Sequence, residues 1–237
     1  MPTDLVFEKD SEGKIITTKP TLWHCHGSRS LRPLWALEEM GIDYDVGPMQ
    51  SPPRINELNF KEMNVLGTVP YFIDGQQRMS ESTGICHYLV ERYDHAALKI
   101  DINDAAYADY LNWLYMSDAT LLFPQTLVLR YSLFEPAERQ SPQVAEDYKH
   151  WFWARLKRLD QHLATHTYLC GNRFTIADIA VGYALYLGVT NGLESGYSES
   201  IKGYLARLMD REAFKRSAAV GEELSPFVHP ELWTMRK

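Results

Sequence analysis

The sequence has little of several features that mark common protein classes. Only three cysteines occur in 237 residues, an odd and sparse set that does not suit a disulfide framework. Basic residues are not in excess, with 24 Lys and Arg against 31 Asp and Glu and a net charge of −7, which argues against nucleic-acid binding. No apolar run is long enough for a membrane span, and no segment resembles a signal peptide. We therefore expect a cytoplasmic protein with no nucleic-acid or membrane partner.

Metal-binding motifs are also missing. No CxxC or HExxH occurs in the sequence, although either would start a recognisable ligand set. His24 and His26 flank Cys25 in the strand-like stretch TLWHCH. On a strand the two histidines share one face and Cys25 points to the other, so the three cannot converge on one ion. We predict no metal.

The first hundred residues alternate between strand-like and helix-like patterns. Gly41 is a plausible helix stop, and Asp74-Gly75 is a turn between two short strands. The resulting order from residue 20 is βαβαββα. The segments are TLWHCH, LRPLWALEEMG, IDYDV, PPRINELNFKEM, YFID, QQRMS and ESTGICHYLVERY.

The rest of the chain is helix-like. An amphipathic stretch, ADYLNWLYMSDATLLF, precedes Pro124, where we expect a break or a kink. Thr175 and Asp178 fit a capping box at the start of a later helix. We therefore predict an N-terminal extension over residues 1–19 that forms a short hairpin, an α/β domain over 20–94, a linker over 95–103 and an all-helical domain over 104–237.

Two serines lie where the first strand of the α/β domain turns into its first helix. Free N–H groups and the positive end of the helix dipole meet at such a turn, and Arg29 and Arg32 add positive charge. Ser30 fits the helix cap. That assignment leaves the hydroxyl of Ser28 free to bond an anion.

Two further segments have polar groups that suit a ligand. Val69-Pro70 opens a strand, and a bend there exposes the backbone of Val69 to an extended peptide. Glu81-Ser82 starts a helix whose free amides suit a carboxylate, while Glu81 suits an ammonium group. Taken singly, Val69-Pro70 is equally well explained as a plain turn, and Glu81-Ser82 as an ordinary helix cap.

The three segments together resemble the glutathione transferase superfamily. The resemblance rests on SRSLRPLWALEE, on NVLGTVPYFIDG with the SES that follows it, and on GNRFTIADIAVG, and it covers residues 20 to about 220. The first segment is similar to an SRSxRxxWxLEE variant of some bacterial and fungal members. The resemblance implies a thioredoxin-like domain with a cis-proline at Pro70, an all-α domain, a homodimer, and glutathione as co-substrate.

The resemblance also implies roles for particular residues. Ser28, with Ser30 as the alternative, would hydrogen-bond the glutathione thiolate. The backbone of Val69 would pair with the cysteinyl part of glutathione, and Glu81 and Ser82 would hold its γ-glutamyl end. The predicted glutathione-binding set is Arg32, Thr68, Val69, Pro70, Glu81 and Ser82. Thr68 stands where many members have Lys or Gln, which weakens one contact.

Departures from the family pattern favour a serine-type transferase. The catalytic tyrosine of several animal classes is absent from the first strand, and Gly27 and Arg29 stand near the cysteine position of the thiol-transferase branch. Two alternatives stay open: a non-catalytic transferase-like binding module, and a glutathione-dependent thiol oxidoreductase that uses Cys25. Cys25 lies in the strand, away from the helix N-terminus that would stabilise a thiolate.

The second substrate is less well defined by the sequence. Tyr110, Trp113 and Ser117 are spaced for one face of the first long helix and would line a pocket for an aromatic or apolar electrophile. Trp113 suits the helical core equally well. GSRSLRPL and ESTGICHYL are similar to segments of bacterial glutathione-dependent β-aryl-ether-cleaving enzymes, so the implied roles are detoxification or aromatic catabolism.

Overall fold

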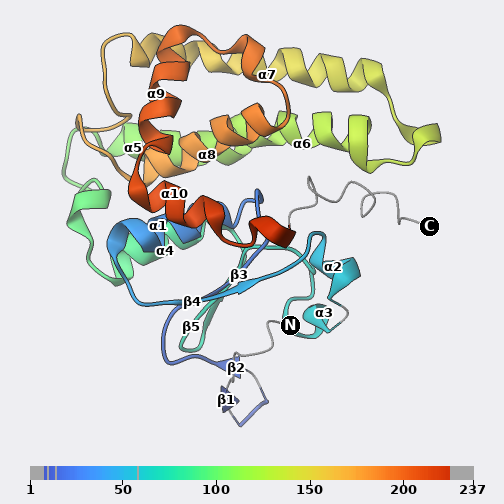
Figure 1. Cartoon of the computed structure of the whole chain (residues 1–237). Coiled ribbons are helices and arrows are strands. Elements are labelled where there is room, and N and C mark those ends of the chain that lie inside the picture. Colours follow the sequence, from blue (N-terminus) through green and yellow to red (C-terminus); the bar gives the residue numbers. More distant parts are fainter. Residues whose placement is uncertain (1–7, 10, 14, 58, 225–237) are drawn as a thin grey trace. The chain divides into compact units, whose positions relative to one another are not determined.

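The computed structural model describes residues 8–9, 11–13, 15–57 and 59–224. The chain forms two compact units (Figure 1). Of the described residues, the first unit holds those up to Asp94 together with 212–224, and the second unit holds 95–211. The second unit is therefore inserted, along the sequence, between two parts of the first.

A four-stranded mixed sheet forms the centre of the first unit. Its order is β4-β3-β5-β6, with β3 and β4 parallel and the other neighbours antiparallel. Trp23 lies opposite both Gly47 and Tyr71. The strands are β3 (Thr21–His24), β4 (Asp45–Pro48), β5 (Tyr71–Asp74) and β6 (Gln77–Met79). A separate hairpin of β1 (Glu8–Lys9) and β2 (Ile15–Ile16) matches the expected hairpin.

The helices of the first unit follow the predicted βαβαββα order, except that two short helices stand where one was predicted over PPRINELNFKEM and that α10 is added at the end. They are α1 (Leu31–Met40), α2 (Pro53–Asn56), α3 (Phe60–Met63), α4 (Ser82–Arg92) and α10 (Glu212–Ala219). Gly41 ends α1 with a φ of 63°, the left-handed conformation that glycine adopts without strain.

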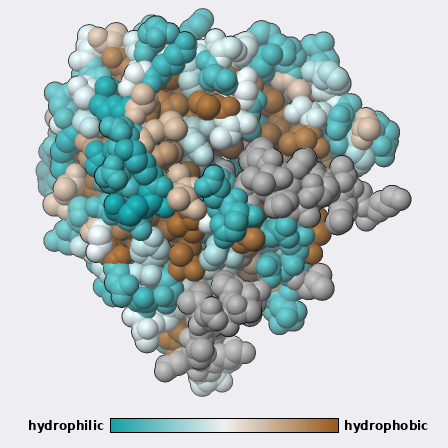
Figure 2. All heavy atoms as spheres, viewed as in Figure 1, coloured by the Kyte–Doolittle hydropathy of each residue, from teal (hydrophilic) through white to brown (hydrophobic). Residues whose placement is uncertain are grey.

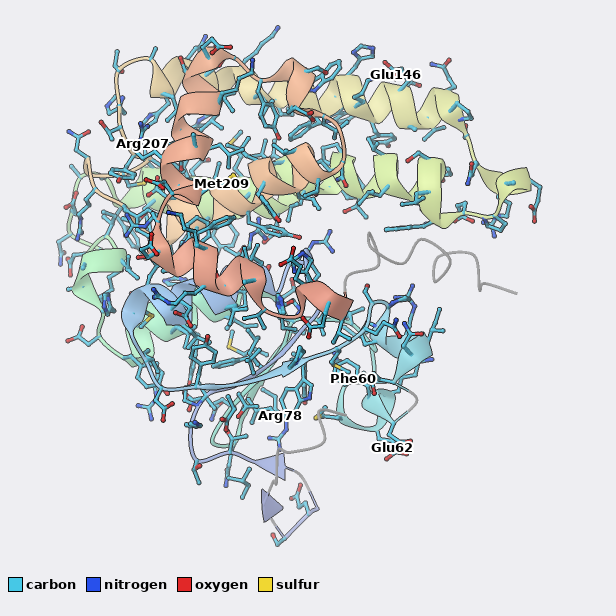
Figure 3. All side chains as sticks on the ribbon, in the orientation of Figure 1. Phe60, Glu62, Arg78, Glu146, Arg207 and Met209 are labelled. Carbon is cyan, nitrogen blue, oxygen red and sulfur yellow. The ribbon has the colours of Figure 1, made fainter. Side chains whose placement is uncertain are left out.

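The two faces of the sheet pack against different helices. Trp23, Cys25, Tyr71 and Ile73 form a buried cluster with Phe60 of α3, which is labelled in Figure 3. Phe72 points to the other face, because successive side chains of a strand alternate, and its ring contacts Tyr88 of α4. This alternation places His24 on the face opposite to Cys25.

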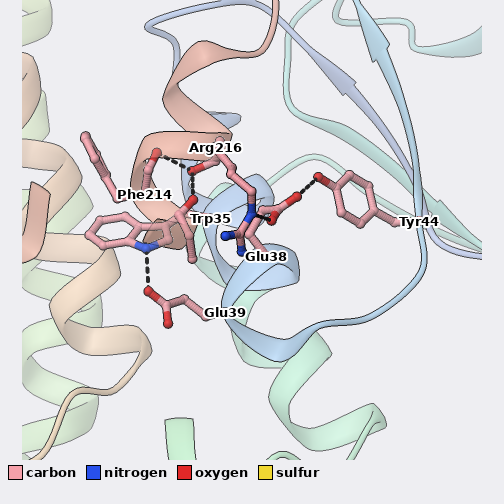
Figure 4. Close-up of polar contacts among 8 residues, drawn as sticks. Trp35, Glu38, Glu39, Tyr44, Phe214 and Arg216 are labelled. Carbon is pink, nitrogen blue, oxygen red and sulfur yellow. Dashed lines mark hydrogen bonds and ion pairs between the residues drawn. The ribbon is translucent and has the colours of Figure 1, made fainter. Parts of the chain in front are cut away.

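Helix α10 packs against α1 of the first unit. The Arg216 guanidinium donates to Glu38 at 2.6 Å, and the Trp35 and Phe214 rings meet edge to face with centroids 4.9 Å apart (Figure 4). The predicted all-helical domain over 104–237 includes the residues of α10, because a short amphipathic helix does not reveal in its own sequence which partner it covers.

The second unit is helical. Its α-helices are α5 (Tyr107–Met116), α6 (Phe123–Leu129), α7 (Pro142–Leu163), α8 (Ile176–Thr190) and α9 (Glu199–Met209). The expected break at Pro124 does not occur, because a π-helical turn over residues 117–122 joins α5 to α6. Pro124 falls in the first turn of α6, where its missing N–H is tolerated.

The capping box of α8 is confirmed. The Thr175 hydroxyl accepts from the Ala177 N–H, and Asp178 Oδ2 accepts from the Thr175 N–H at 2.8 Å. Asp178 is fully buried and also accepts from the Leu169 N–H and the Tyr204 hydroxyl. Burial raises the pKa of Asp178 to about 6. Within the described part of the chain, every helix is too short or too polar to cross a bilayer.

Candidate functional site

The loop after β3 brings Ser28 and Ser30 close together. Gly27 has a φ of 69°, and the Ser28 N–H donates to the Cys25 carbonyl at 3.1 Å. The left-handed glycine lets the chain turn sharply from β3 into α1. Ser28 is half-buried at this turn, whereas Ser30 is fully buried.

The side chain of Ser30 does not cap α1, contrary to the expectation from the sequence. Ser30 already has helical backbone angles (φ −66°, ψ −13°) and makes no side-chain cap bond. Its Oγ instead accepts from the Cys25 N–H at 3.2 Å and lies 2.7 Å from Ser28 Oγ. The hydroxyl of Ser28 is therefore hydrogen-bonded in this structure. The prediction that it is free is wrong.

His24 joins this serine pair to the segment after α10. Its Nδ1 lies 2.8 Å from Ser30 Oγ, and its Nε2 lies 3.2 Å from the Val220 carbonyl oxygen. Burial, and to a lesser degree the neighbouring His26, lowers the pKa of His24 to about 4. His24 is thus neutral near pH 7. The sequence analysis treated it as an ordinary strand residue.

Cys25 lies in the hydrophobic cluster on the opposite face of the sheet. Its side chain is fully buried beside Trp23, Met49 and Tyr71. Burial, with a smaller contribution from the Glu57 charge, raises the pKa of Cys25 to about 12. A reactive cysteine needs an accessible thiolate, so this environment disfavours the chemistry that the alternative assigned to Cys25.

The segment before β5 presents an open backbone. The Val69–Pro70 peptide is cis, as the resemblance implied. The Asn64 amide donates to the Thr68 carbonyl at 2.7 Å and anchors the preceding loop. Among the described residues no partner is found for the backbone N–H and C=O of half-buried Val69. Asn64 is absent from the predicted site, and the signal for it in the sequence was an asparagine three residues before the glycine of NVLGTVP.

Glu81 and Ser82 lie at the N-terminus of α4. Glu81 is exposed and has an extended backbone, whereas Ser82 is buried. The buried Arg32 of α1 donates from its guanidinium to Ser82 Oγ at 3.1 Å. Ser82 Oγ accepts this bond and donates no hydrogen bond to another described residue, so its proton can bind a ligand. Arg32 thus connects α1 to the start of α4.

These segments meet at one end of the sheet in the first unit. β3 and β5 run antiparallel with Trp23 opposite Tyr71, so the residues that follow His24 lie beside those that precede Tyr71. The Arg32–Ser82 bond adds the N-terminus of α4. Ser28, the Val69 backbone and Ser82 therefore come from three segments of the chain that converge.

The residues predicted to line a second-substrate pocket are buried. Tyr110, Trp113 and Ser117 are each at most 1% exposed. The Trp113 ring contacts His162 with centroids 5.4 Å apart, and the Ser117 hydroxyl donates to the Leu114 carbonyl. This burial favours the core interpretation that the sequence left open.

The second unit has a surface cavity elsewhere, between α5 with its π-helical extension and α7. Its volume is about 560 Å³. Tyr115 and Met116 line it from one side, and Arg155 and Arg158 line it from the other.

No group of three or more His, Cys, Asp or Glu side chains in the described ranges is placed to hold a metal ion.

Comparison with known sequences identifies related proteins. Residues 19–91 match the model of the glutathione S-transferase N-terminal domain, and residues 152–187 match that of the C-terminal domain. The chain is 23% identical over 215 residues to glutathione S-transferase 3 of Schizosaccharomyces pombe, covering 85% of this chain and 88% of the relative. It is 26% identical over 200 residues to glutathione S-transferase GstB of Escherichia coli K12, covering 83% of this chain and 96% of the relative.

Solved structures show the same fold. Ure2p5 from Phanerochaete chrysosporium, cocrystallised with 1-(S-glutathionyl)-2,4-dinitrobenzene, aligns with a TM-score of 0.74 at 21% identity, covering 93% of this chain and 99% of that one. A sphingomonad glutathione S-transferase complexed with glutathione aligns with a TM-score of 0.74 at 22% identity, covering 85% and 98%. The chain therefore carries the N- and C-terminal domains of glutathione S-transferases in order, and these matches, the relatives and the shared fold support the glutathione transferase superfamily.

Proposed function

We propose that this protein is a serine-type glutathione transferase in which Ser28 hydrogen-bonds the sulfur of bound glutathione. The observation that carries the proposal is the convergence of Ser28, the Val69 backbone and Ser82 within one unit. Ser28 is preferred over Ser30, because Ser30 is fully buried and bonded to His24 and Cys25. Half-buried Ser28 has surface that a ligand reaches.

The binding residues suit a γ-glutamyl tripeptide. The backbone N–H and C=O of Val69 would pair with the cysteinyl backbone as an added strand does. The Ser82 hydroxyl and the first N–H groups of α4 would bind the γ-glutamyl carboxylate, and the exposed Glu81 carboxylate would bind its ammonium group. Thr68, Pro70 and Arg32 would shape and hold this pocket.

The proposed reaction begins with transfer of the thiol proton to solvent water. An ordinary thiol has a pKa near 8.5, and lowering it by about two units requires about 2.7 kcal/mol of preferential thiolate stabilisation. The Ser28 hydroxyl and the N-terminus of α1 are the groups placed to contribute. The thiolate then forms a carbon–sulfur bond at an electrophilic carbon, and the leaving group departs with the bonding electrons.

The test combines glutathione binding with thiolate formation. We expect calorimetry to show glutathione binding to wild type and to Ser28→Ala, and ultraviolet absorbance to show thiolate near neutral pH only in wild type. Ser132→Ala is the matched control, because Ser132 lies on the exposed surface of the second unit. Absence of glutathione binding to wild type would contradict the proposal.

The electrophile is tested separately. The Ure2p5 structure contains a glutathionyl dinitrobenzene conjugate, so 1-chloro-2,4-dinitrobenzene is a suitable probe for aromatic substitution. Glutathione binding without thiolate would favour the second candidate, a non-catalytic binding module. The hydrogen bond that occupies Ser28 in this structure is the observation that favours it.

We further propose that the protein is a homodimer. Exposed aromatic side chains occur on three helices of the second unit, at Tyr115 of α5 (69% exposed), Phe123 of α6 (57%) and Trp151 of α7 (51%). The Tyr148 and Trp151 rings are stacked with centroids 5.7 Å apart. Aromatic side chains of this kind are enriched in protein interfaces.

A further inference from the structure

The hydrogen bonds around His24 have a definite direction. The Val220 carbonyl can only accept, so His24 Nε2 carries the proton of the neutral ring and Nδ1 is an acceptor. Ser30 must then donate its single hydroxyl proton to Nδ1 at 2.8 Å, a shorter contact than the 3.4 Å to the Cys25 carbonyl. The 2.7 Å bond between the serines is therefore donated by Ser28 to Ser30.

This order determines what Ser28 offers to a ligand. Its proton is directed at Ser30, and among the described residues its Oγ lone pairs receive only a long 3.4 Å contact from the Ser30 N–H. A neutral thiol can donate to such an oxygen, whereas a thiolate needs a donor. For Ser28 to donate to a thiolate, its proton must leave Ser30.

The free-energy cost of turning the Ser28 proton away from Ser30 depends on His24. If Ser28 turns its proton away, Ser30 keeps the Cys25 N–H as a donor, but the two serine oxygens face each other with no proton between them. If Ser30 donates to Ser28 instead, the buried Nδ1 of His24 loses its partner, and an unpaired buried acceptor is costly. Both routes oppose ionisation of the thiol.

We propose that His24 sets the donor order of the serine pair, so that Ser28 receives glutathione as a hydrogen-bond acceptor and thiol ionisation is restrained. His24 is a positioning residue in this proposal, because it acts through Ser30 and does not touch the ligand. The proposal rests on the serine-type function, with Ser28 as the group at the sulfur.

The test measures the pKa of glutathione's thiol in the bound state by ultraviolet absorbance. We expect His24→Phe to lower it by about 0.5–1 unit relative to wild type, because Ser30 becomes free to donate to Ser28 and Ser28 to the thiolate. Ser30→Ala should lower it in the same direction. Ser28→Ala should raise it, because the thiolate, once formed against this restraint, loses the Ser28 hydroxyl as its donor.

His24→Gln is the matched control. Its amide oxygen can accept from Ser30 and its amide NH2 can donate to Val220, so this variant should leave the pKa of the bound thiol unchanged. General damage to the fold would weaken glutathione binding or raise that pKa. A lowered pKa of the bound thiol therefore indicates that the Ser28 proton is no longer directed at Ser30.

The outcomes separate this proposal from the function on which it rests. If Ser28→Ala raises the thiol pKa but His24→Phe and Ser30→Ala leave it unchanged or raise it, the positioning role of His24 is overturned and the transferase proposal stands. If Ser28→Ala leaves the pKa of the bound thiol unchanged, both the positioning role of His24 and the serine-type transferase proposal are contradicted. Should His24→Phe not fold, nitrogen NMR of the His24 ring in the wild-type protein decides, because a proton on Nδ1 at pH 7 overturns the assigned order.

Discussion

His24 links the stability of the first unit to pH. Its pKa is about 4 in the folded protein against 6.5 as the ordinary value, because burial penalises the imidazolium. Between these values the unfolded chain binds the proton and the folded protein does not. The contribution of His24 to stability is therefore fully present above pH 6.5 and is lost as the pH falls toward 4.

We expect His24→Gln to flatten this dependence. The lowered pKa of His24 corresponds to a loss of about 3 kcal/mol in the free energy of unfolding between pH 6.5 and pH 4. The variant should not show this loss, because glutamine does not titrate. Denaturant unfolding at several pH values measures it. The raised pKa of Asp178 acts in the opposite direction, with stability lost as the pH rises through about 6, but it is present in both proteins and cancels in the comparison. Equal slopes in the two proteins would contradict the prediction.

The sequence identified the serines of the site but not how they are bonded. Ser28 and Ser30 were found because a strand-to-helix turn is a local pattern. The bond from His24 to Val220 joins residues 196 positions apart, and no local pattern reports such a contact. Local sequence also does not report the partner of Arg32. Its charge suggested a ligand contact, and its guanidinium binds Ser82.

Helix α8 begins with a cap that its sequence predicts well. Thr175 and Asp178 lie within one turn, so their reciprocal bonds depend only on local geometry. By contrast, the π-helical turn over residues 117–122 was not predicted, because its wider hydrogen bonding depends on how neighbouring helices pack. Local elements were thus predicted better than the irregular joint between α5 and α6.

Thr175→Ala should destabilise the second unit by about 1–2 kcal/mol, because the Ala177 N–H loses its cap. Chemical denaturation followed by circular dichroism measures this change. Thr167→Ala is the control, since Thr167 is exposed and should change the free energy of unfolding by less than about 0.5 kcal/mol. An equal effect of the two substitutions would show that the cap contributes nothing.

The architecture of the whole chain followed from its pattern of strands and helices, with one exception. The βαβαββα order and the helical second part were predicted correctly, because hydrophobic periodicity reports each element. The exception is α10, which belongs to the first unit although the second separates it from α4 in the sequence. Figure 2 shows hydrophilic and hydrophobic residues interspersed on one face of the molecule.

We expect the protein to sediment as a dimer at micromolar concentration. The exposed aromatic residues of α5, α6 and α7 provide apolar area for an interface. Trp151→Glu should shift the equilibrium toward monomer, because a buried unpaired carboxylate is costly. Glu146→Gln, on the exposed surface of α7, is the control. A wild-type monomer in analytical ultracentrifugation would refute the dimer.

The return of the chain to the first unit has a consequence for biosynthesis. A ribosome makes β3, α1 and β5 early, yet Trp35, Glu38 and His24 contact partners that lie in residues 214–220. The inserted second unit has been synthesised completely before those partners exist. The serine pair therefore acquires its final bonding only after residue 220 has left the exit tunnel, and a nascent chain stalled before that point would carry the serine pair without the contact between His24 and Val220.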